Sequence, residues 1–301
     1  RLAKTDKPFY MGLGYFRPHL PFAVPKKYWD LYDPEEIPLA SNPNVPKNAP
    51  GHTMNSMYEL RHYEGFNTIG HPQSSYQMNE DTARILKQGY YASVSYVDAL
   101  LGNLMAHMKR IGIYENTIII IWGDHGWKLG DHNSWGKMTN YNMDLKVPMI
   151  IRYPNQENRG AQTFEITELV DIFPSLCELA GIKIPDYMQG TSFVPLIKKP
   201  QRAWKKAAFS QFHRRPQHSA DGKRYMGYSI NTKKYHYIEW YAWSPETGTK
   251  GALKSMELFD NVSDPTETVN LAEEQKLSQV VAELTEQLAL GWRKARPLDF
   301  E

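Results

Sequence analysis

Residues able to bind a metal ion and an oxyanion are concentrated in one segment, 123–137. Within it, the carboxylate of Asp124 offers hard oxygen to a divalent cation, and His125 offers a ring nitrogen beside it. Lys137 can supply a positive charge to a tetrahedral oxyanion. Gly126 and Gly130 allow the backbone to turn closely around a ligand. A polar loop whose Asp and His cap the next helix would explain the same spacing, so both interpretations stay open at this point.

A second candidate is His19, which lies between two prolines in the segment Arg17-Pro18-His19-Leu20-Pro21. The prolines restrict the backbone on both sides and so limit where the imidazole can lie. An imidazole held in place suits proton transfer or contact with an oxyanion. A histidine with a purely structural role is the alternative.

Strands and helices must position these residues. The apolar run at 117–122 contains four successive isoleucines, and it is predicted to be a strand buried on both faces. The segment 123–137 follows the end of this strand, and in open α/β sheets ligands bind beyond the carboxyl ends of strands. Apolar residues at helical spacing predict a helix at 81–112 that ends at a glycine.

Further strands are predicted at 9–15 and 147–153, and a helix is predicted from Asp171, as its cap, to Gly181. Strand and helix therefore alternate, which is typical of a doubly wound α/β domain. Cys177 falls on the apolar face of the last helix, so it is expected to be a small core residue.

The pattern changes near residue 200. Residues 225–230 and 235–240 flank Asn231-Thr232 and predict a hairpin, and 256–259 predicts another strand. Apolar residues between 277 and 292 recur at helical spacing and predict a final amphipathic helix. We therefore predict two parts, an α/β domain over 1–200 and a small antiparallel sheet with one packed helix over 201–301.

Composition argues against several classes of protein. The 301 residues carry a net charge of +2 with acids and bases interspersed, so neither a nucleic-acid partner nor a membrane partner is expected. No apolar run is long enough to span a bilayer. The single cysteine allows no internal disulfide and no cysteine metal cluster.

Several motifs together resemble the type I sulfatases of the alkaline-phosphatase superfamily. The similarity extends across nearly the whole chain, and the segments 92–96 and 226–230 resemble the iduronate-2-sulfatase-like group more narrowly. The motifs are Pro18-His19-Leu20-Pro21-Phe22, Ala92-Ser93-Val94-Ser95-Tyr96, Asp124-His125-Gly126-Trp127 with Lys137, Asp171-Ile172-Phe173-Pro174-Ser175 and Met226-Gly227-Tyr228-Ser229-Ile230.

The resemblance implies an alkaline-phosphatase-like sulfatase fold, with 1–200 as the C-terminal part of the catalytic α/β domain and 201–301 as the small subdomain. It also implies roles for individual residues. Asp124 and His125 match the second pair of calcium-site residues. Lys137 matches a lysine that contacts the sulfate, and His19 matches a histidine near the sulfate and the leaving oxygen. The candidates to contact the sugar are Trp127, His132 and Arg17.

One family motif does not occur in this sequence: Cys/Ser-x-Pro-Ser-Arg, whose first residue becomes the formylglycine nucleophile. Cys177 is followed by Glu178-Leu179-Ala180 and does not match it. The resemblance places the nucleophile and the other calcium ligands in an N-terminal segment or chain, which is therefore an expected partner beside a sulfated carbohydrate. Sulfatases of this type are secreted, periplasmic or lysosomal, so export is expected, although this chain shows no signal sequence.

The expected function is hydrolysis of an O-sulfate ester on a sulfated uronate in a polysaccharide or oligosaccharide, such as a glycosaminoglycan. A phosphatase or phosphonate hydrolase of the same superfamily is one alternative, because it would use the same Asp124 and His125 metal pair. A carbohydrate-binding protein on a sulfatase fold, without activity, is the other. A pure binder would have no need of the metal pair together with Lys137 and His19, which argues against it.

Overall fold

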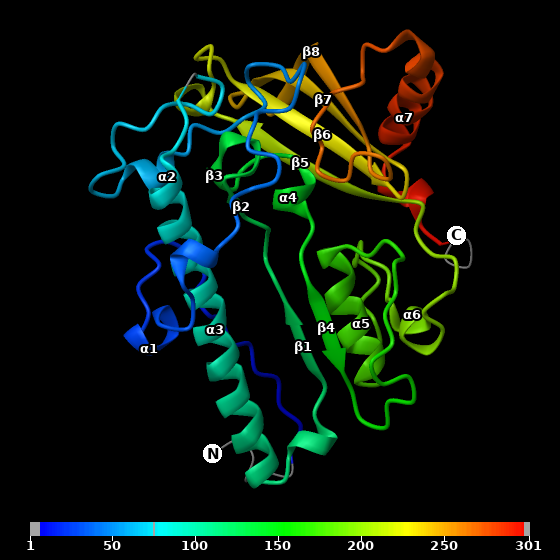
Figure 1. The fold of residues 1–301 in the computed structure, drawn as a ribbon. Helices are drawn as coiled ribbons and strands as arrows, with labels where there is room; N and C mark the ends of the chain where they lie inside the picture. Colours follow the sequence, from blue (N-terminus) through cyan, green and yellow to red (C-terminus); the bar gives the residue numbers. More distant parts are fainter. Residues whose placement is uncertain (1–6, 75, 298–301) are drawn as a thin grey trace.

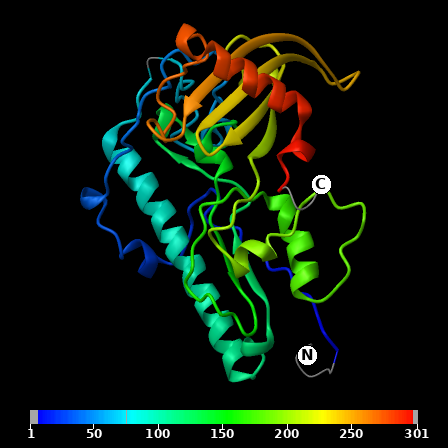
Figure 2. The ribbon, with the colours of Figure 1, turned by 90° about the vertical axis from the view of Figure 1, so that its right-hand side faces the viewer.

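The computed structural model describes residues 7–74 and 76–297. A long helix and a two-stranded ribbon lie on one side of a four-stranded antiparallel sheet (Figure 1). The view turned by 90° shows the last helix lying against that sheet (Figure 2). Among the residues described, no helix combines the length and the apolar character needed to cross a bilayer.

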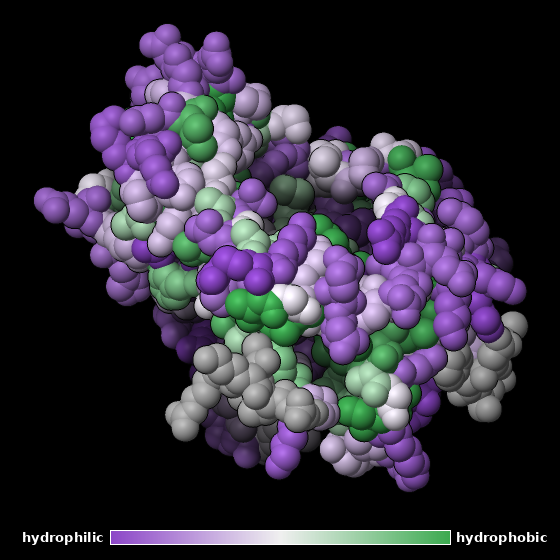
Figure 3. Space-filling view, turned by 90° about the horizontal axis from the view of Figure 1, so that it is seen from below, coloured by the Kyte–Doolittle hydropathy of each residue, from purple (hydrophilic) through white to green (hydrophobic). Residues whose placement is uncertain are grey.

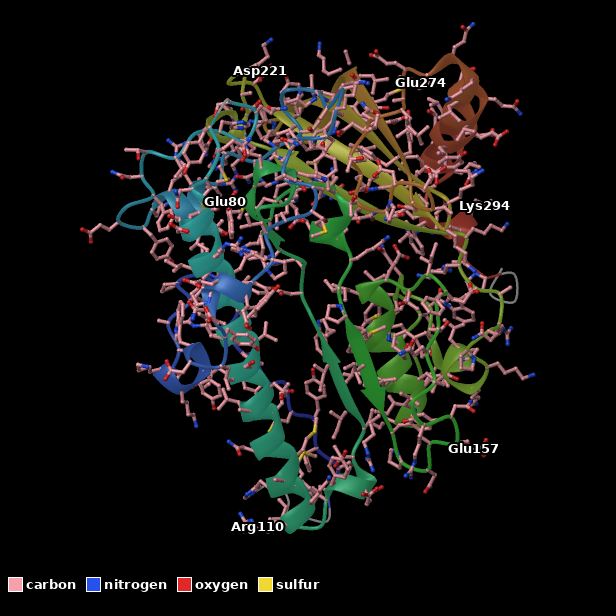
Figure 4. The ribbon with its side chains drawn as sticks, in the orientation of Figure 1. Glu80, Arg110, Glu157, Asp221, Glu274 and Lys294 are labelled. Atoms are coloured by element: carbon pink, nitrogen blue, oxygen red, sulfur yellow. The ribbon has the colours of Figure 1, made fainter. Side chains whose placement is uncertain are left out.

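The long helix, α3 (Glu80–Arg110), confirms the prediction at 81–112. Asn79 begins it by accepting a hydrogen bond from the Thr82 backbone N–H at 3.2 Å. Figure 4 labels its two ends, Glu80 and Arg110. Near the middle, a Cβ at Gly89 would come within 2.8 Å of Phe22 and 2.7 Å of Trp29. The glycine therefore lets the 17–29 segment pack directly against the helix.

Several short helices and strands lie in the N-terminal half of the chain. A hydrophobic core packed against α3 includes Leu20, Phe22, Leu60, Leu86 and Trp135. The elements are α1 (Lys26–Trp29), η2 (Pro34–Glu36), α2 (Tyr58–Arg61), η3 (Tyr114–Asn116), β2 (Lys128–Leu129), η4 (Asp131–Asn133), β3 (Trp135–Gly136) and α4 (Asn142–Leu145).

Strands β1 (Ile119–Trp122) and β4 (Met149–Arg152) occur where they were predicted, but they pair antiparallel rather than in a parallel sheet. The prediction that β1 is buried on both faces was also wrong, because β1 is half-buried and its Trp122 is 43% exposed. Ile150 on β4 is 64% exposed. Each strand has only the other as its ladder partner in the described chain, so each keeps one edge without a ladder partner there.

The prediction of a strand at 9–15 was wrong. These residues have no ladder partner in the described chain, and Phe9, Met11 and Leu13 are 38%, 49% and 52% exposed. Such apolar runs are buried where strands flank them in a sheet, whereas 9–15 has no neighbouring strand in the described chain.

Helix α5 (Ile172–Leu179) confirms the predicted helix, and Cys177 is buried in it. Asp171 does not cap this helix with its side chain. Its carboxylate instead accepts from Lys205 Nζ at 2.8 Å and from the Thr191 backbone N–H at 2.7 Å. The ion pair with Lys205 and the hydrogen bond from Thr191 thus take the place of the expected cap of α5 by the Asp171 side chain. The neighbouring elements are η5 (Leu169–Asp171) and α6 (Val194–Lys198).

The C-terminal sheet has the strand order β5-β6-β7-β8 and is antiparallel throughout. The predicted hairpin is confirmed, although its turn is at Lys233 and Lys234 because β6 continues through Thr232. The first strand, at 207–214, was not predicted. The elements are β5 (Ala207–Arg214), η6 (Pro216–His218), β6 (Tyr225–Thr232), β7 (Tyr235–Ser244), β8 (Thr249–Asp260), η7 (Gln275–Leu277), α7 (Ser278–Leu290) and η8 (Trp292–Ala295).

Helix α7 confirms the predicted amphipathic helix. Its Leu284 is 4% exposed and belongs to a core cluster with Ala207, Ile230, Tyr237 and Leu258 of the sheet. Burial of this apolar face is what holds the helix against the strands.

Candidate active site

The loop after β1 presents Asp124 and His125. The Asp124 side chain is 85% exposed, and its Oδ2 lies 3.5 Å from His125 Nε2. His125 Nδ1 donates to the Gly126 carbonyl at 2.8 Å, because a carbonyl oxygen can only accept. In the neutral ring, Nε2 therefore keeps its lone pair on the side of the Asp124 carboxylate.

Gly126 is required by packing rather than by a ligand. A Cβ at this position would lie 1.9 Å from the Met143 carbonyl oxygen, and the Gly126 N–H donates to the Asp144 carbonyl at 2.8 Å. The loop is therefore pressed against α4. The expectation that this glycine closes around a ligand is not what its contacts show.

The structure brings Lys137 to His19, although 118 residues separate them in the sequence. Lys137 Nζ lies 3.0 Å from His19 Nε2. His19 Nδ1 donates to the Leu20 carbonyl at 2.8 Å, so Nε2 of the neutral ring accepts from the lysine. The lysine side chain is 11% exposed and the histidine is 35% exposed. Both groups can thus reach a ligand that arrives from solvent.

Trp127 lies at the centre of this group. Its ring lies 4.9 Å from Lys137 Nζ, 5.9 Å from the His19 ring and 6.5 Å from the His125 ring. The Phe22 ring contacts the same indole. His19, His125 and Lys137 therefore lie in one cluster around one aromatic ring.

Glu59 belongs to this cluster and was missed by the sequence analysis. Its Oε2 and Oε1 lie 2.8 and 3.0 Å from Lys137 Nζ, and Oε1 lies 3.7 Å from His19 Nε2. Glu59 lies on the four-residue helix α2, in a region with no periodic pattern. No signal in the sequence separated it from other acidic residues.

Two of the predicted sugar contacts have other roles in this structure. His132 is fully buried, and its Nε2 donates to the Thr266 carbonyl at 2.8 Å, so it has no surface for a sugar. That prediction was wrong. Arg17 donates from Nε to the Ala23 carbonyl at 3.0 Å and from Nη1 to the His19 carbonyl at 3.4 Å. These bonds hold the loop that carries His19.

A buried ion pair connects the segment 123–137 to α4. Lys128 Nζ contacts Asp144 Oδ1 at 2.6 Å, with side-chain exposures of 0% and 4%. Thr139 Oγ1 accepts from the same lysine at 2.8 Å, and the Thr139 N–H donates to Asp144 Oδ2 at 2.8 Å. Because these groups satisfy one another, two buried charges can be kept without water.

Tyr141 ties this loop to the C-terminal sheet. Its hydroxyl donates to Glu257 Oε1 at 2.6 Å and contacts Thr53 Oγ1 at 2.8 Å. Trp240 Nε1 donates to the other Glu257 oxygen at 2.8 Å. Burial raises the pKa of Glu257 to about 7, and burial together with this carboxyl raises the pKa of Tyr141 well above its usual value.

The donors at Asp124 and His125 are too few for a complete metal site. A calcium ion takes six to eight oxygen ligands, whereas residues 7–74 and 76–297 contain no group of three or more His, Cys, Asp or Glu side chains arranged around one ion. The exposed carboxylate with a free ring nitrogen beside it suits a site completed by other groups.

Two family models match the chain. The model described as "Sulfatase" matches residues 2–182, and that described as "N-sulphoglucosamine sulphohydrolase, C-terminal" matches residues 130–294. The chain belongs to the sulfatase family. The sulfatase match includes all of the clustered residues, from His19 to Lys137.

Named relatives agree with this assignment. The chain is 29% identical to iduronate 2-sulfatase of Mus musculus over 90% of its own length and 59% of that protein. A solved structure in complex with D-glucosamine-2-N,6-O-disulfate matches with a TM-score of 0.72 at 20% identity, covering 91% of this chain and 63% of that one. Phosphonate monoester hydrolase of Agrobacterium radiobacter matches with a TM-score of 0.73 at 24% identity, over 96% and 57%. These structures show the alkaline-phosphatase-like sulfatase fold, and the chain spans little more than half the length of such relatives.

Proposed function

We propose that the protein containing this chain hydrolyses O-sulfate esters on a sulfated uronate of a polysaccharide or oligosaccharide. The observation that carries the proposal is the convergence of His19, Trp127 and Lys137 beside the exposed Asp124 and His125. The similarity to iduronate 2-sulfatase, which covers 90% of the chain, supports the uronate as the sugar.

Each residue of the cluster has a chemical role in this proposal. Lys137 donates N–H groups to the sulfate oxygens and opposes the negative charge that gathers on them during transfer. His19 presents Nε2 on the same side, and in the protonated ring the Nε2 proton can pass to the departing sugar oxygen while Nδ1–H stays on the Leu20 carbonyl. The transfer leaves a neutral ring whose Nε2 lone pair accepts from Lys137. The Trp127 ring offers an apolar face for the sugar.

Asp124 and His125 are this chain's proposed contribution to a calcium site. A bound calcium ion would neutralise sulfate oxygens, and a formylglycine outside this chain would supply the nucleophile. Export of the whole protein to a periplasmic, secreted or lysosomal location is part of the same proposal, on the model of its family.

The rest of the same protein is the proposed macromolecular partner. Trp122 and Ile150 of the β1–β4 pair and Phe9 and Leu13 of the segment 9–15 are between 38% and 64% exposed, which is unusual for large apolar residues. Seen from below, apolar residues (green) form patches among hydrophilic ones (purple) in Figure 3. Packing of an N-terminal segment or chain against these side chains would bury them and complete the sheet.

The test is hydrolysis by the full-length gene product. We expect release of sulfate from a disaccharide that carries a 2-O-sulfated uronate, and a loss of at least about 100-fold in kcat for Lys137→Ala. Lys233→Ala, which removes an exposed lysine paired with Glu165 on the surface, is the matched control and should keep full activity. Faster release of phosphate from a phosphate or phosphonate ester would instead favour the related hydrolases, and sugar binding without turnover would favour a binding protein.

A further inference from the structure

The position of Glu59 is unusual for an acid in a site that takes a dianion. Both carboxylate oxygens lie within 3.0 Å of Lys137 Nζ, the group assigned to the sulfate. The side chains of Glu59 and Lys137 are 21% and 11% exposed, so water screens this ion pair only in part. An incoming sulfate therefore meets a lysine that already has an anionic partner.

The backbone of Glu59 is well fixed. Met57 at the start of α2 adopts a left-handed conformation with φ 55°, and its N–H donates to Asn55 Oδ1 at 3.0 Å. On either side of Glu59, the Tyr58 ring stacks on His218 at 4.2 Å and Leu60 is 2% exposed in the core. These two anchors direct the intervening side chain toward Lys137.

The hydrogen bonds of Lys137 leave little room for another acceptor. An ammonium group has three N–H donors and no acceptor. His19 Nε2 and the two Glu59 oxygens provide three acceptors within 3.0 Å. A sulfate oxygen that binds Lys137 must therefore displace one of these acceptors, and two of the three belong to Glu59.

We propose that Glu59 is a positioning residue that holds Lys137 against His19 and competes with sulfate for the ammonium group. This inference rests on the proposed function, since it takes Lys137 as the sulfate contact. The carboxylate keeps the lysine oriented before the ester arrives, weakens the hold on the product sulfate, and takes the lysine back when sulfate leaves.

The test compares wild type, Glu59→Gln and Glu59→Asp of the full-length protein with inorganic sulfate as a competitive inhibitor. We expect the inhibition constant of sulfate to fall about fivefold to tenfold in Glu59→Gln, because an anion has been removed from Lys137. Its kcat should fall as well, since the lysine is less well oriented and the product leaves more slowly. Glu59→Asp keeps the charge and should restore an inhibition constant near that of wild type.

Glu168→Gln is the matched control. Glu168 also pairs with a buried lysine, Lys205, at 2.6 Å with side-chain exposures of 15% and 5%, and the pair is apart from the cluster. This variant can lose stability but should bind sulfate as wild type does. If wild type cleaves sulfate esters and Glu59→Gln binds sulfate no more tightly than wild type, the role of Glu59 is refuted while the proposed function stands. If wild type cleaves no sulfate ester, the proposed function and the role of Glu59 both fail.

Discussion

The ammonium group of Lys137 lies over the indole of Trp127, with Nζ 4.9 Å from the ring centroid. This contact joins a residue assigned to the sulfate with one assigned to the sugar, and the His19 ring meets the same indole edge-on at 5.9 Å. The aromatic ring therefore orients two polar groups at once, in addition to offering its own face.

Trp127→Ala should lower kcat/KM for the sulfated disaccharide by about tenfold or more, because the cation–π contact and the apolar face are lost together. Trp127→Phe keeps a ring and should retain an intermediate activity. Steady-state kinetics on the full-length protein measures both effects. Trp243→Ala, on strand β7 and outside the cluster, is the control, and an equal loss there would show that the effect is not local.

The buried pair of Lys128 and Asp144 should be costly to break. Lys128→Met leaves the Asp144 carboxylate buried without its cation, so we expect the free energy of unfolding to fall by about 3–5 kcal/mol. Urea denaturation followed by fluorescence measures this change. The matched surface pair is Lys26 and Asp30, with exposures of 85% and 54%, and Lys26→Met should change stability little. Equal losses of stability in Lys128→Met and Lys26→Met would contradict the idea that burial makes the first pair costly to break.

Glu257 should make stability depend on pH. Its pKa rises from 4.5 to about 7 on folding, because burial disfavours the charged carboxylate. Between these values the unfolded chain releases the proton and the folded chain keeps it. The contribution of Glu257 to stability is therefore complete below pH 4.5 and is lost as the pH rises to 7, a change of up to about 3 kcal/mol.

The measurement for Glu257 is denaturant unfolding of wild type and Glu257→Gln at several pH values. The amide does not titrate, so the difference in free energy of unfolding should move in favour of the variant between pH 4.5 and 7 and stay constant above. A difference that does not change with pH would show that Glu257 titrates normally in the folded protein.

Calcium should stabilise the full-length protein through Asp124. We expect added calcium to raise Tm by a few degrees, because a ligand that binds only the folded state stabilises it, and Asp124→Ala should remove this rise. Thermal unfolding with and without a chelator tests this without any activity assay. Asp186→Ala removes a carboxylate of similar exposure, 90%, and should leave the calcium effect intact. A calcium effect that survives in Asp124→Ala would place the metal elsewhere.

Periodicity predicted α3, α7 and the hairpin because helical or strand spacing can be read within a single segment, although Ile85 and Val94 of the α3 pattern are 52% and 46% exposed. It failed for 9–15 and for the burial of β1, because burial of a strand depends on neighbours that the local sequence does not describe. The strand β5 was missed because Ser210 and Gln211 interrupt its apolar residues and the strand ends in His213 and Arg214.

Within the site, motif similarity named Asp124, His125 and Trp127, which lie close together in the sequence. It also named His19 and Lys137, whose contact the structure then showed. It could not find Glu59, which reaches the cluster only through the fold of a short helix. It misassigned His132 because a histidine in a polar loop looks the same in sequence whether it faces solvent or the core.

The link between the loop that carries Lys137 and the C-terminal part of the chain has a consequence for engineering. Asn142 Nδ2 donates to Asn261 Oδ1 at 2.8 Å, and the Asn142 N–H donates to Glu267 Oε2 at 2.6 Å, close to the bond between Tyr141 and Glu257. A chimaera that takes this sheet from another sulfatase would therefore disturb the loop that carries Lys137. A crossover near residue 200 should succeed only if residues 139–144 are exchanged together with the sheet.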